Sequence, residues 1–237
     1  MKRVDRYNLA RKLNWCALGL VDYEKAFALQ ERLKAGLRKE DKAGYLLLLE
    51  HHPTITLGYS LRGDEGKSEI RASEGELKES GIKVLQVDRG GKATYHGPGQ
   101  LVGYPILDLR QFRLGAKRYI GKMEQMLLKL LNELGVSARI DARYPGLWVR
   151  DEKIAALGVR IQDKLTTHGF AINLNPDLEH FSCIVPCGIT QRGVTSLERV
   201  SGHVPPMSEV IERVVRLFGE EFSTEMYESS PGELWLN

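Results

Sequence analysis

The chain has 237 residues, of which 42% are hydrophobic and 27% charged, and its formal net charge is +3. These values are ordinary for a soluble globular protein with a sizeable core. Lys and Arg residues alternate with Asp and Glu instead of forming like-charged blocks, so the composition gives no support to a nucleic-acid-binding protein.

The N-terminal segment predicts neither a signal sequence nor a membrane anchor. MKRVDRYNLARKLNW contains no apolar run, and the longest apolar cluster, around Tyr45 to Glu50, is far too short to span a bilayer. The three cysteines, Cys16, Cys183 and Cys187, lack the spacing of a disulfide framework, which suits a reducing compartment. We therefore expect a cytoplasmic monomer that makes no membrane contact.

The first predicted element is an amphipathic helix over residues 22–40. Asp22 is a suitable N-cap for it. Six positions recur at helical spacing and are expected to face inward: Tyr23, Ala26, Phe27, Gln30, Leu33 and Leu37. YLLLLEHHPTITLG then predicts two short strands around a turn at Pro53, a polar segment spans residues 61–81, and KVLQVDR predicts a further strand.

The segment RGGKATYHGPGQLVGYPILD, residues 89–108, contains five glycines and two prolines. Gly97, Pro98 and Gly99 predict a tight turn before the strand that begins near Leu101. No helix follows the glycines, so the segment is neither a P-loop nor a dinucleotide-binding fingerprint. It either exposes main-chain amides to a ligand beside Tyr95 and His96 or forms a hairpin without a ligand.

The second half of the chain predicts two more helices and three strands. AKRYIGKMEQMLLKLLNELG is a helix with one apolar stripe, and Gly135 stands where a left-handed C-terminal residue is expected. Antiparallel hairpins are predicted for three strand-like runs, GLWVR, KIAALGVRI and THGFAINLN. The last helix is predicted over MSEVIERVVRLFGEEF. This order of elements predicts an α+β fold, a mixed central sheet flanked by helices. We expect one domain over residues 1–237, at most with a small C-terminal lobe from about residue 190.

Two residues are candidates for catalysis, Cys187 and Lys153. Pro186 and Gly188 restrict Cys187 to a turn, whereas Cys16 lies in an apolar run and is expected to be a buried hydrophobe. A thiol with its reference pKa of about 8.5 is only a few per cent thiolate at neutral pH, so a nucleophilic cysteine needs a basic neighbour. Lys153 opens the apolar strand KIAALGV. It is either a solvated lysine at a strand edge or an amine that enters a pocket and exchanges protons with a nucleophile.

His168, His180, Cys183 and Cys187 are candidate metal ligands. The last three are spaced as His-x2-Cys and Cys-x3-Cys. Structural zinc sites favour two separate pairs of ligands, and no second pair exists elsewhere in the chain. We therefore expect no metal.

Taken together, these motifs resemble those of the lipoyl(octanoyl) transferase family. The segments that carry the resemblance are RGGKATYHGPGQLVGYPILDL, KIAALGVRI, HGFAINLN and PCGI followed by VTSL. The resemblance runs in order from Arg89 to Leu197, with HPTITLG before it. It implies a fold shared with the catalytic domains of biotin and lipoate protein ligases, and no cofactor. It also implies transfer of an octanoyl group from octanoyl-acyl carrier protein to a lysine of an acceptor. The implied acceptors are the lipoyl domains of 2-oxoacid dehydrogenase complexes and the glycine cleavage H protein.

The resemblance also implies roles for individual residues. Cys187 matches the nucleophile that carries the acyl group as a thioester, and Lys153 matches the catalytic lysine that activates it. The segments that match the family's substrate-binding residues are Arg89, Gly90, Gly91, Lys92, Ala93, Thr94, Tyr95, His96, Ala156, Leu157, Gly158, Gly169, Phe170 and Ala171. The small residues among them are expected to enclose an acyl chain, with Tyr95 and His96 lining the mouth between pocket and thiol.

Three other functions remain open at this point. An ATP-dependent lipoate or biotin ligase would share the fold but would leave PCGI unexplained, and the chain has no GRGRxGR loop. A thiol-dependent hydrolase would use water in place of the acceptor lysine. A pure binding module would have no need of a Cys187 and Lys153 pair.

Overall fold

The computed structural model describes residues 11–37, 43–61, 66, 68–141, 143–185 and 192–236. The strands of its large sheet are β1 (Arg11–Val21), β2 (Gly44–His51), β6 (Gln100–Leu107), β7 (Arg139–Ile140), β8 (Gly146–Val149), β9 (Glu152–Gln162), β10 (Leu165–Asn173), β11 (Gly193–Val194) and β12 (Thr224–Glu228). Those of a small sheet are β3 (Thr54–Leu57), β4 (Lys83–Gln86) and β5 (Ala93–His96). Within the described ranges, the large sheet has the order β12-β1-β2-β6-β10-β9-β8-β7 with β11 beside β9, and the small one has the order β4-β3-β5.

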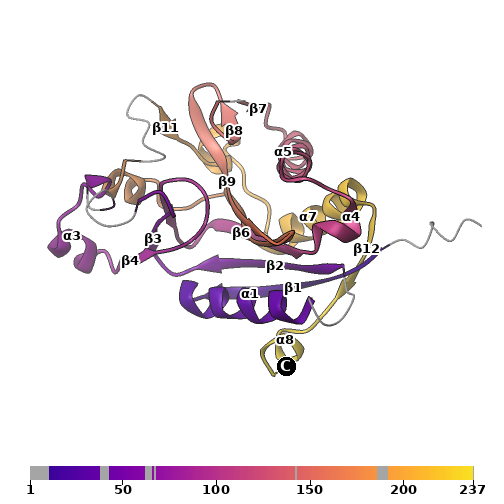
Figure 1. Cartoon of the computed structure of the whole chain (residues 1–237). Coiled ribbons are helices and arrows are strands. Elements are labelled where there is room, and N and C mark those ends of the chain that lie inside the picture. The colour runs from indigo at the N-terminus through magenta and orange to yellow at the C-terminus, as the bar shows by residue number, and fades with distance from the viewer. Residues whose placement is uncertain are drawn as a thin grey trace, which may run out of the picture.

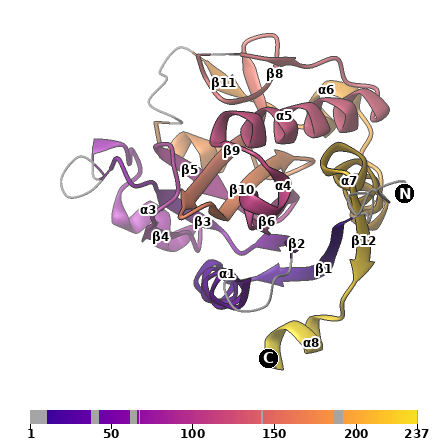
Figure 2. The ribbon, with the colours of Figure 1, turned by 45° about the vertical axis from the view of Figure 1, so that its right-hand side comes forward.

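Helices cover both faces of the large sheet. They are α1 (Tyr23–Leu37), α3 (Glu74–Glu79), α4 (Leu109–Phe112), α5 (Ala116–Glu133), α6 (Leu197–Ser201), α7 (Met207–Phe222) and α8 (Pro231–Leu236), with the 3-10 helix η1 (Glu179–Cys183). Helix α1 lies against one face, while α5 and α7 pack on the other (Figure 1). The turned view in Figure 2 shows the same layers, with the small sheet at the end of the molecule away from α7. The predicted α+β fold with a mixed sheet is confirmed.

The two faces are held by separate hydrophobic clusters. Met123, Leu127 and Leu130 of α5 pack with Val214 and Phe218 of α7 above the sheet. Below it, α1 contributes the apolar stripe that its spacing predicts, and Tyr23, Ala26, Gln30 and Leu37 are buried. The helices predicted at 116–135 and 207–222 are thus confirmed, and the one predicted at 22–40 is confirmed over Tyr23–Leu37, since residues 38–40 lie outside the described residues. Each buries a long periodic stripe.

Several elements were not predicted. The eleven-residue strand β1 is parallel to β2, and α1 connects them, which makes a β-α-β unit at the start of the described chain. The segment 61–81, predicted only to be polar, contains α3, which begins with a capping box between Ser73 and Glu76. The two strands predicted around Pro53 are present, but β2 belongs to the large sheet and β3 to the small one.

The hairpin of β9 and β10 forms the centre of the antiparallel half of the large sheet. Gln162 pairs with Leu165, so the turn consists of Asp163 and Lys164, whose φ angles are 52° and 67°. Positive φ at both positions is the type I′ geometry that matches the right-handed twist of hairpin strands.

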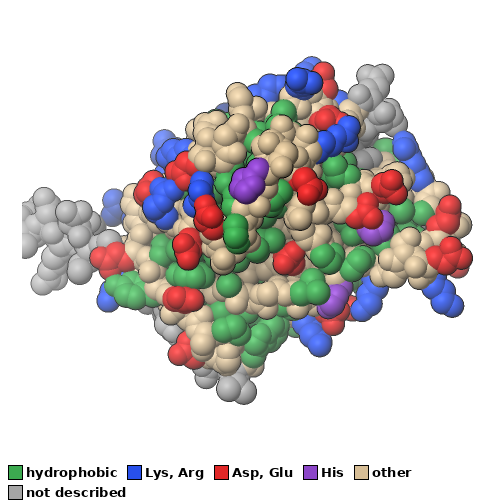
Figure 3. Space-filling view, turned by 180° about the vertical axis from the view of Figure 1, so that it is seen from behind, with side chains coloured by type: hydrophobic (Ala, Val, Ile, Leu, Met, Phe, Trp, Pro, Cys, Tyr) green, Lys and Arg blue, Asp and Glu red, His purple; other side chains and the backbone are tan. Residues whose placement is uncertain are grey.

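Within the described ranges, no helix is long and apolar enough to cross a membrane. On the face that Figure 3 presents, acidic and basic side chains are interspersed, in keeping with the small net charge.

Candidate active site

A cavity of about 370 Å³ lies between the large sheet and the small one. That volume is within the range of small-molecule sites. Most of the residues predicted to bind substrate line it: Arg89, Gly90, Gly91, Lys92, Ala93, Thr94, His96, Ala156, Leu157, Gly158, Gly169, Phe170 and Ala171, together with Lys153. Segments that are far apart in the sequence therefore meet at one site.

Tyr95 is not part of the cavity wall. Successive side chains of a strand point to opposite faces, so Thr94 and His96 of β5 face the cavity and Tyr95 faces away. Its hydroxyl lies 2.8 Å from His180 Nδ1, and its ring packs edge-on against Phe181. His96 does line the cavity, and its ring stacks on that of Tyr23.

Lys153 lies in the wall of the cavity and is only 8% exposed. Its ammonium donates a hydrogen bond of 3.3 Å to the carbonyl of Pro145 and lies 4.8 Å from the centre of the Trp148 indole. A cation over an aromatic face is favourable, most of all where water is excluded. The strand-edge alternative of a solvated lysine is therefore wrong.

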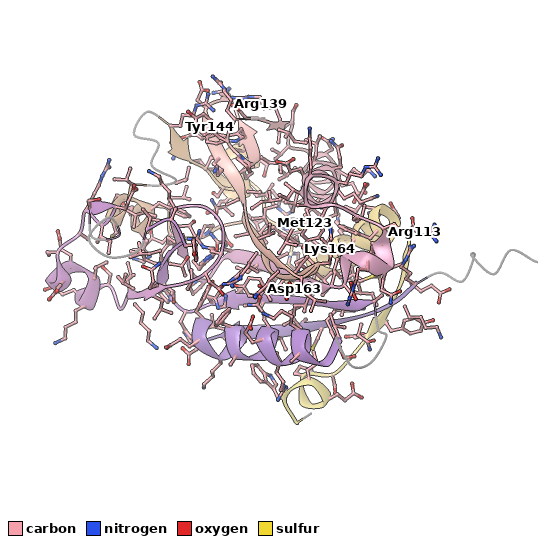
Figure 4. All side chains as sticks on the ribbon, viewed as in Figure 1. Arg113, Met123, Arg139, Tyr144, Asp163 and Lys164 are labelled. Atoms are coloured by element: carbon pink, nitrogen blue, oxygen red, sulfur yellow. The ribbon has the colours of Figure 1, made fainter. Side chains whose placement is uncertain are left out.

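The same indole carries a second cation. The Arg192 guanidinium stands 5.0 Å from the Trp148 centroid and donates a 2.9 Å hydrogen bond to Asp141. The main-chain N–H of Arg143 and then the guanidinium of Arg192 hold the pKa of Asp141 well below its usual range. Tyr144 and Arg139, labelled in Figure 4, lie at this end of the molecule.

A β-bulge turns Lys153 toward the cavity. Trp148 of β8 pairs with Lys153 and Leu147 pairs with Ala155, so Ile154 has no partner on β8. In a regular strand, residues three apart face opposite sides. The extra residue of the bulge shifts this alternation, which explains why Lys153 and Ala156 both line the cavity.

Small residues form the floor of the cavity. Ala156 of β9 pairs with Ala171 of β10, and Gly158 pairs with Gly169 in the next row. A Cβ atom on Gly169 would lie 2.1 Å from the carbonyl oxygen of Gly103, so only glycine fits there. The floor thus combines close-packed backbone and small side chains with Leu157 and Phe170, which pair in the row between them.

Polar rings form part of the cavity wall, and of these only His96 was predicted as a site residue. The others are Tyr23, Tyr104 and His168. Burial raises the pKa of Tyr23 to about 12 and lowers the pKa of both His96 and His168. These rings are therefore neutral at pH 7.

His168 has an unusual backbone for a residue within a strand. Its φ is 57°, and its main-chain N–H donates a 2.7 Å hydrogen bond to Gln30 Oε1 of α1. Left-handed conformations are uncommon for residues other than glycine and cost about 1–3 kcal/mol when the surroundings impose them. Such strain often accompanies function, but the sequence THGF gives no sign of it.

Cys187, with its neighbours Pro186 and Gly188, lies outside the described residues. The chain resumes at Arg192, and β11 pairs in parallel with β9, so that Val194 is opposite Lys153.

The other thiols and histidines have separate surroundings. Cys16 is fully buried, as expected, and burial raises the pKa of its thiol to about 11. Burial also raises the pKa of the half-buried Cys183. Among the described residues, no three His, Cys, Asp or Glu side chains are grouped as metal ligands. His168 contacts Asp88 and His180 contacts Tyr95.

Residues 22–219 match the family model of the lipoyl protein ligase A/B catalytic domain. A protein named octanoyltransferase from Caldicellulosiruptor saccharolyticus is 46% identical over 214 residues, which are 89% of this chain and 89% of that protein. An octanoyltransferase from Chloroflexus aurantiacus is 44% identical over 211 residues, 88% of this chain and 93% of that one.

Among solved structures, a lipoate-protein ligase A bound with ATP superposes with a TM-score of 0.76 at 18% identity, covering 95% of this chain and 91% of that one. A bipartite lipoate protein ligase from Thermoplasma acidophilum, described together with its E2 lipoyl domain, gives 0.72 at 20% identity, with 94% and 89% covered. These two structures share the fold.

Proposed function

The chain belongs to the lipoyl protein ligase A/B catalytic-domain family and is an acyltransferase that acts in octanoyl transfer for lipoylation. We propose that it takes the octanoyl group from octanoyl-acyl carrier protein, holds it as a thioester on Cys187 and passes it to a lysine of an acceptor. The proposed acceptors are the lipoyl domains of 2-oxoacid dehydrogenase complexes and the glycine cleavage H protein. The reaction takes place in the cytoplasm and needs no cofactor.

The observation that carries the proposal is the position of Lys153. Its ammonium is buried at one end of a cavity whose floor is made of alanine and glycine. Such an enclosure suits an acyl chain, because burial stabilises it by about 0.8 kcal/mol per methylene group. A buried amine beside that cavity is suited to take up and return the protons of the reacting thiol and acceptor amine, which is the role proposed for it.

The two half-reactions balance without ATP. In the first, the neutral amine form of Lys153 takes the proton of the Cys187 thiol, the thiolate attacks the thioester carbonyl, and the pantetheine sulfur leaves and takes that proton back. In the second, the neutral acceptor amine, whose reference pKa is about 10.4 when protonated, attacks the Cys187 thioester and gives up a proton through Lys153. The Cys187 sulfur leaves and takes that proton, so that an amide and the free thiol form. One thioester replaces another and then becomes a more stable amide. Main-chain N–H groups at Cys187 and Gly188 are proposed to stabilise the oxyanions.

The segment that follows Cys187 supports this arrangement. Val194 pairs with Lys153, and Arg192 contacts the indole on which the Lys153 ammonium lies. The chain therefore returns to Lys153 only a few residues after Cys187.

Intact-mass spectrometry tests the proposal. After mixing with octanoyl-acyl carrier protein, the wild type gains one octanoyl group and Cys187→Ser gains none. Cys183→Ser serves as the matched control and is acylated like the wild type. An octanoyl group retained by Cys187→Ser, or the formation of octanoyl-AMP from octanoate and ATP, would favour a ligase instead. Release of free octanoate faster than transfer to a lipoyl domain would favour a hydrolase.

A further inference from the structure

His96 carries a ring nitrogen that the fold itself does not use. The ring lines the cavity but is only 6% exposed, so it is cut off from bulk water. Its Nδ1 lies 2.7 Å from the side-chain oxygen of Gln100. Among the residues that the structure describes, none forms a hydrogen bond with Nε2. Buried polar atoms are nearly always paired, so an unpaired one in a cavity wall points to a ligand.

A chain of hydrogen bonds fixes which nitrogen of His96 carries the proton. The Asn173 amide nitrogen donates to the Thr195 carbonyl at 2.9 Å, so the Asn173 oxygen accepts from the Gln100 amide nitrogen. That nitrogen also donates to the Tyr95 carbonyl. The Gln100 oxygen therefore accepts, and His96 Nδ1 is the donor. Burial lowers the pKa of His96, so the ring is neutral at pH 7 and Nε2 is its acceptor nitrogen.

His96 and Lys153 lie at the same level of the cavity. Gln100 pairs with Asn173 across β6 and β10, and the main-chain N–H of Thr195 donates to the Lys153 carbonyl at 3.0 Å. A second, small cavity of about 20 Å³ is lined by Lys153, Gln100 and Asn173 together. The chain of hydrogen bonds that holds His96 thus ends beside Lys153. Since β5 belongs to the small sheet and β9 to the large one, the two side chains reach the main cavity from different walls.

The reaction offers few partners to an acceptor nitrogen at this level. A thioester has only acceptor atoms, its carbonyl oxygen and its sulfur, so it cannot donate to Nε2. Two groups do carry a proton to donate, the thiol and the acceptor amine, and the thiol is already assigned to Lys153. An amine reacts well only when its lone pair points at the acyl carbon. A hydrogen bond from one N–H to a fixed acceptor sets that direction and leaves the lone pair available.

We propose that His96 is a further catalytic residue, whose Nε2 accepts a hydrogen bond from the amine of the acceptor lysine and directs its lone pair at the acyl carbon; this rests on the proposed function. Lys153 remains the group that carries the proton of the amine to the leaving sulfur. His96 consequently acts in the second half-reaction and not in the first. The hydrogen bonds through Gln100 hold its ring in place before the amine arrives.

The test measures the two half-reactions separately by intact-mass spectrometry. The first is acylation by octanoyl-acyl carrier protein, and the second is transfer from the isolated acylated protein to a lipoyl domain. In His96→Asn, the amide nitrogen takes the place of Nδ1, but nothing replaces Nε2. We expect acylation within about twofold of the wild type and transfer slower by roughly 100-fold, the loss that misplacing a reacting group produces.

Two further variants separate this role from a structural one. His96→Gln reaches the position of Nε2 and presents an amide oxygen there, so it should recover part of the transfer rate. His51→Asn is the matched control. His51 is also buried beside the Tyr23 ring, but its two nitrogens are paired with the Val21 carbonyl and the Tyr104 hydroxyl. Its loss should lower stability without changing the ratio of the two rates, because that ratio does not depend on the folded fraction.

Transfer at the wild-type rate in His96→Asn, or equal slowing of both half-reactions, would overturn the inference. Slowing of acylation alone would also overturn it, because Nε2 would then serve the thiol. If the wild type is not acylated at all, the proposed function fails instead. NMR of the His96 nitrogens with n-butylamine, which ends like a lysine side chain, then still tests the assignment. The amine should shift the Nε2 signal, and an unchanged signal would refute the role.

Discussion

Lys153 owes its position to a few specific neighbours. The bulge at Ile154 aims the side chain, the Pro145 carbonyl accepts from the ammonium and the Trp148 indole lies beneath it. All of these contacts lie within residues 145–154, and together they fix one amine at one end of the cavity. A substitution at this position should therefore affect chemistry more than folding.

Lys153→Met should reduce octanoyl transfer by roughly 10²–10⁴-fold, because general acid–base catalysis typically contributes this much. Methionine keeps most of the side-chain length and its contact with the indole. The measurement is single-turnover acylation followed by mass spectrometry, with Lys117→Ala on the exposed side of α5 as control. Full acylation of Lys153→Met would show that another group moves the protons.

At this scale the sequence indicates Lys153, the proposed catalytic lysine, and the small-residue floor, because both lie in contiguous motifs. It does not indicate Tyr23 or Tyr104 as site residues, because each is one apolar-compatible position in a periodic stripe. Tyr95 shows the limit of motif transfer in the other direction. It stands inside the motif, but strand alternation turns it away from the cavity.

Elements position the site through turns and close backbone contacts. The β9–β10 hairpin carries the floor, and its type I′ turn places Lys164 at a φ of 67°. A left-handed conformation costs about 1–2 kcal/mol for a residue with a Cβ, and glycine avoids this while losing about 0.5–1 kcal/mol in chain entropy.

Lys164→Gly should consequently raise the free energy of unfolding by about 0.5 kcal/mol, the difference of those two effects. Urea unfolding followed by circular dichroism measures the change. Lys164→Ala, which keeps the Cβ, is the control and should not stabilise the protein. A loss of stability in Lys164→Gly would mean that the lysine side chain makes a contact worth more than the strain.

Gly169→Ala should lower the free energy of unfolding by about 2 kcal/mol or more, because its Cβ would meet the Gly103 carbonyl oxygen at 2.1 Å. Gly121 in α5 is the matched control, since a Cβ there meets nothing within 4 Å. Gly121→Ala should stabilise by about 0.5–1 kcal/mol through helix propensity. Thermal and urea unfolding of both variants should move in opposite directions, and parallel shifts would contradict the packing argument.

Long periodic helices could be predicted from the sequence, whereas β1 and several short strands at sheet edges could not. Helices α1, α5 and α7 each bury a stripe of several turns, which local spacing predicts. Strands β7, β11 and β12 have two to five residues and exist because a longer strand offers them an edge. Pairing of that kind is decided by tertiary structure.

The molecule as a whole carries a cluster of neutral buried histidines. Burial lowers the pKa of His51 from its ordinary value of 6.5 to about 4, and it lowers the pKa of His96 and His168 too. The unfolded chain binds protons at these residues near pH 6.5, and the folded chain does not. Stability is therefore complete above pH 6.5 and is lost as the pH falls.

Between about pH 6.5 and pH 4, the free energy of unfolding should fall by up to about 1.4 kcal/mol per pH unit through His51, and His96 and His168 add to the fall. Urea unfolding at intervals of one pH unit measures the slope. His51→Gln, which cannot titrate, should reduce the slope, while His203→Gln on the surface should leave it unchanged. A flat profile across this range would mean that the histidines are protonated in the folded protein.

Strand β12, near the C-terminal end, is parallel to β1 and covers its outer edge. A ribosome that synthesises this chain delivers β1 some two hundred residues before β12. Until then the outer edge of β1 offers unpaired main-chain groups to any neighbouring polypeptide. Nascent chains stalled before Thr224 should accordingly aggregate or recruit chaperones, even though Lys153 and the cavity have already been synthesised.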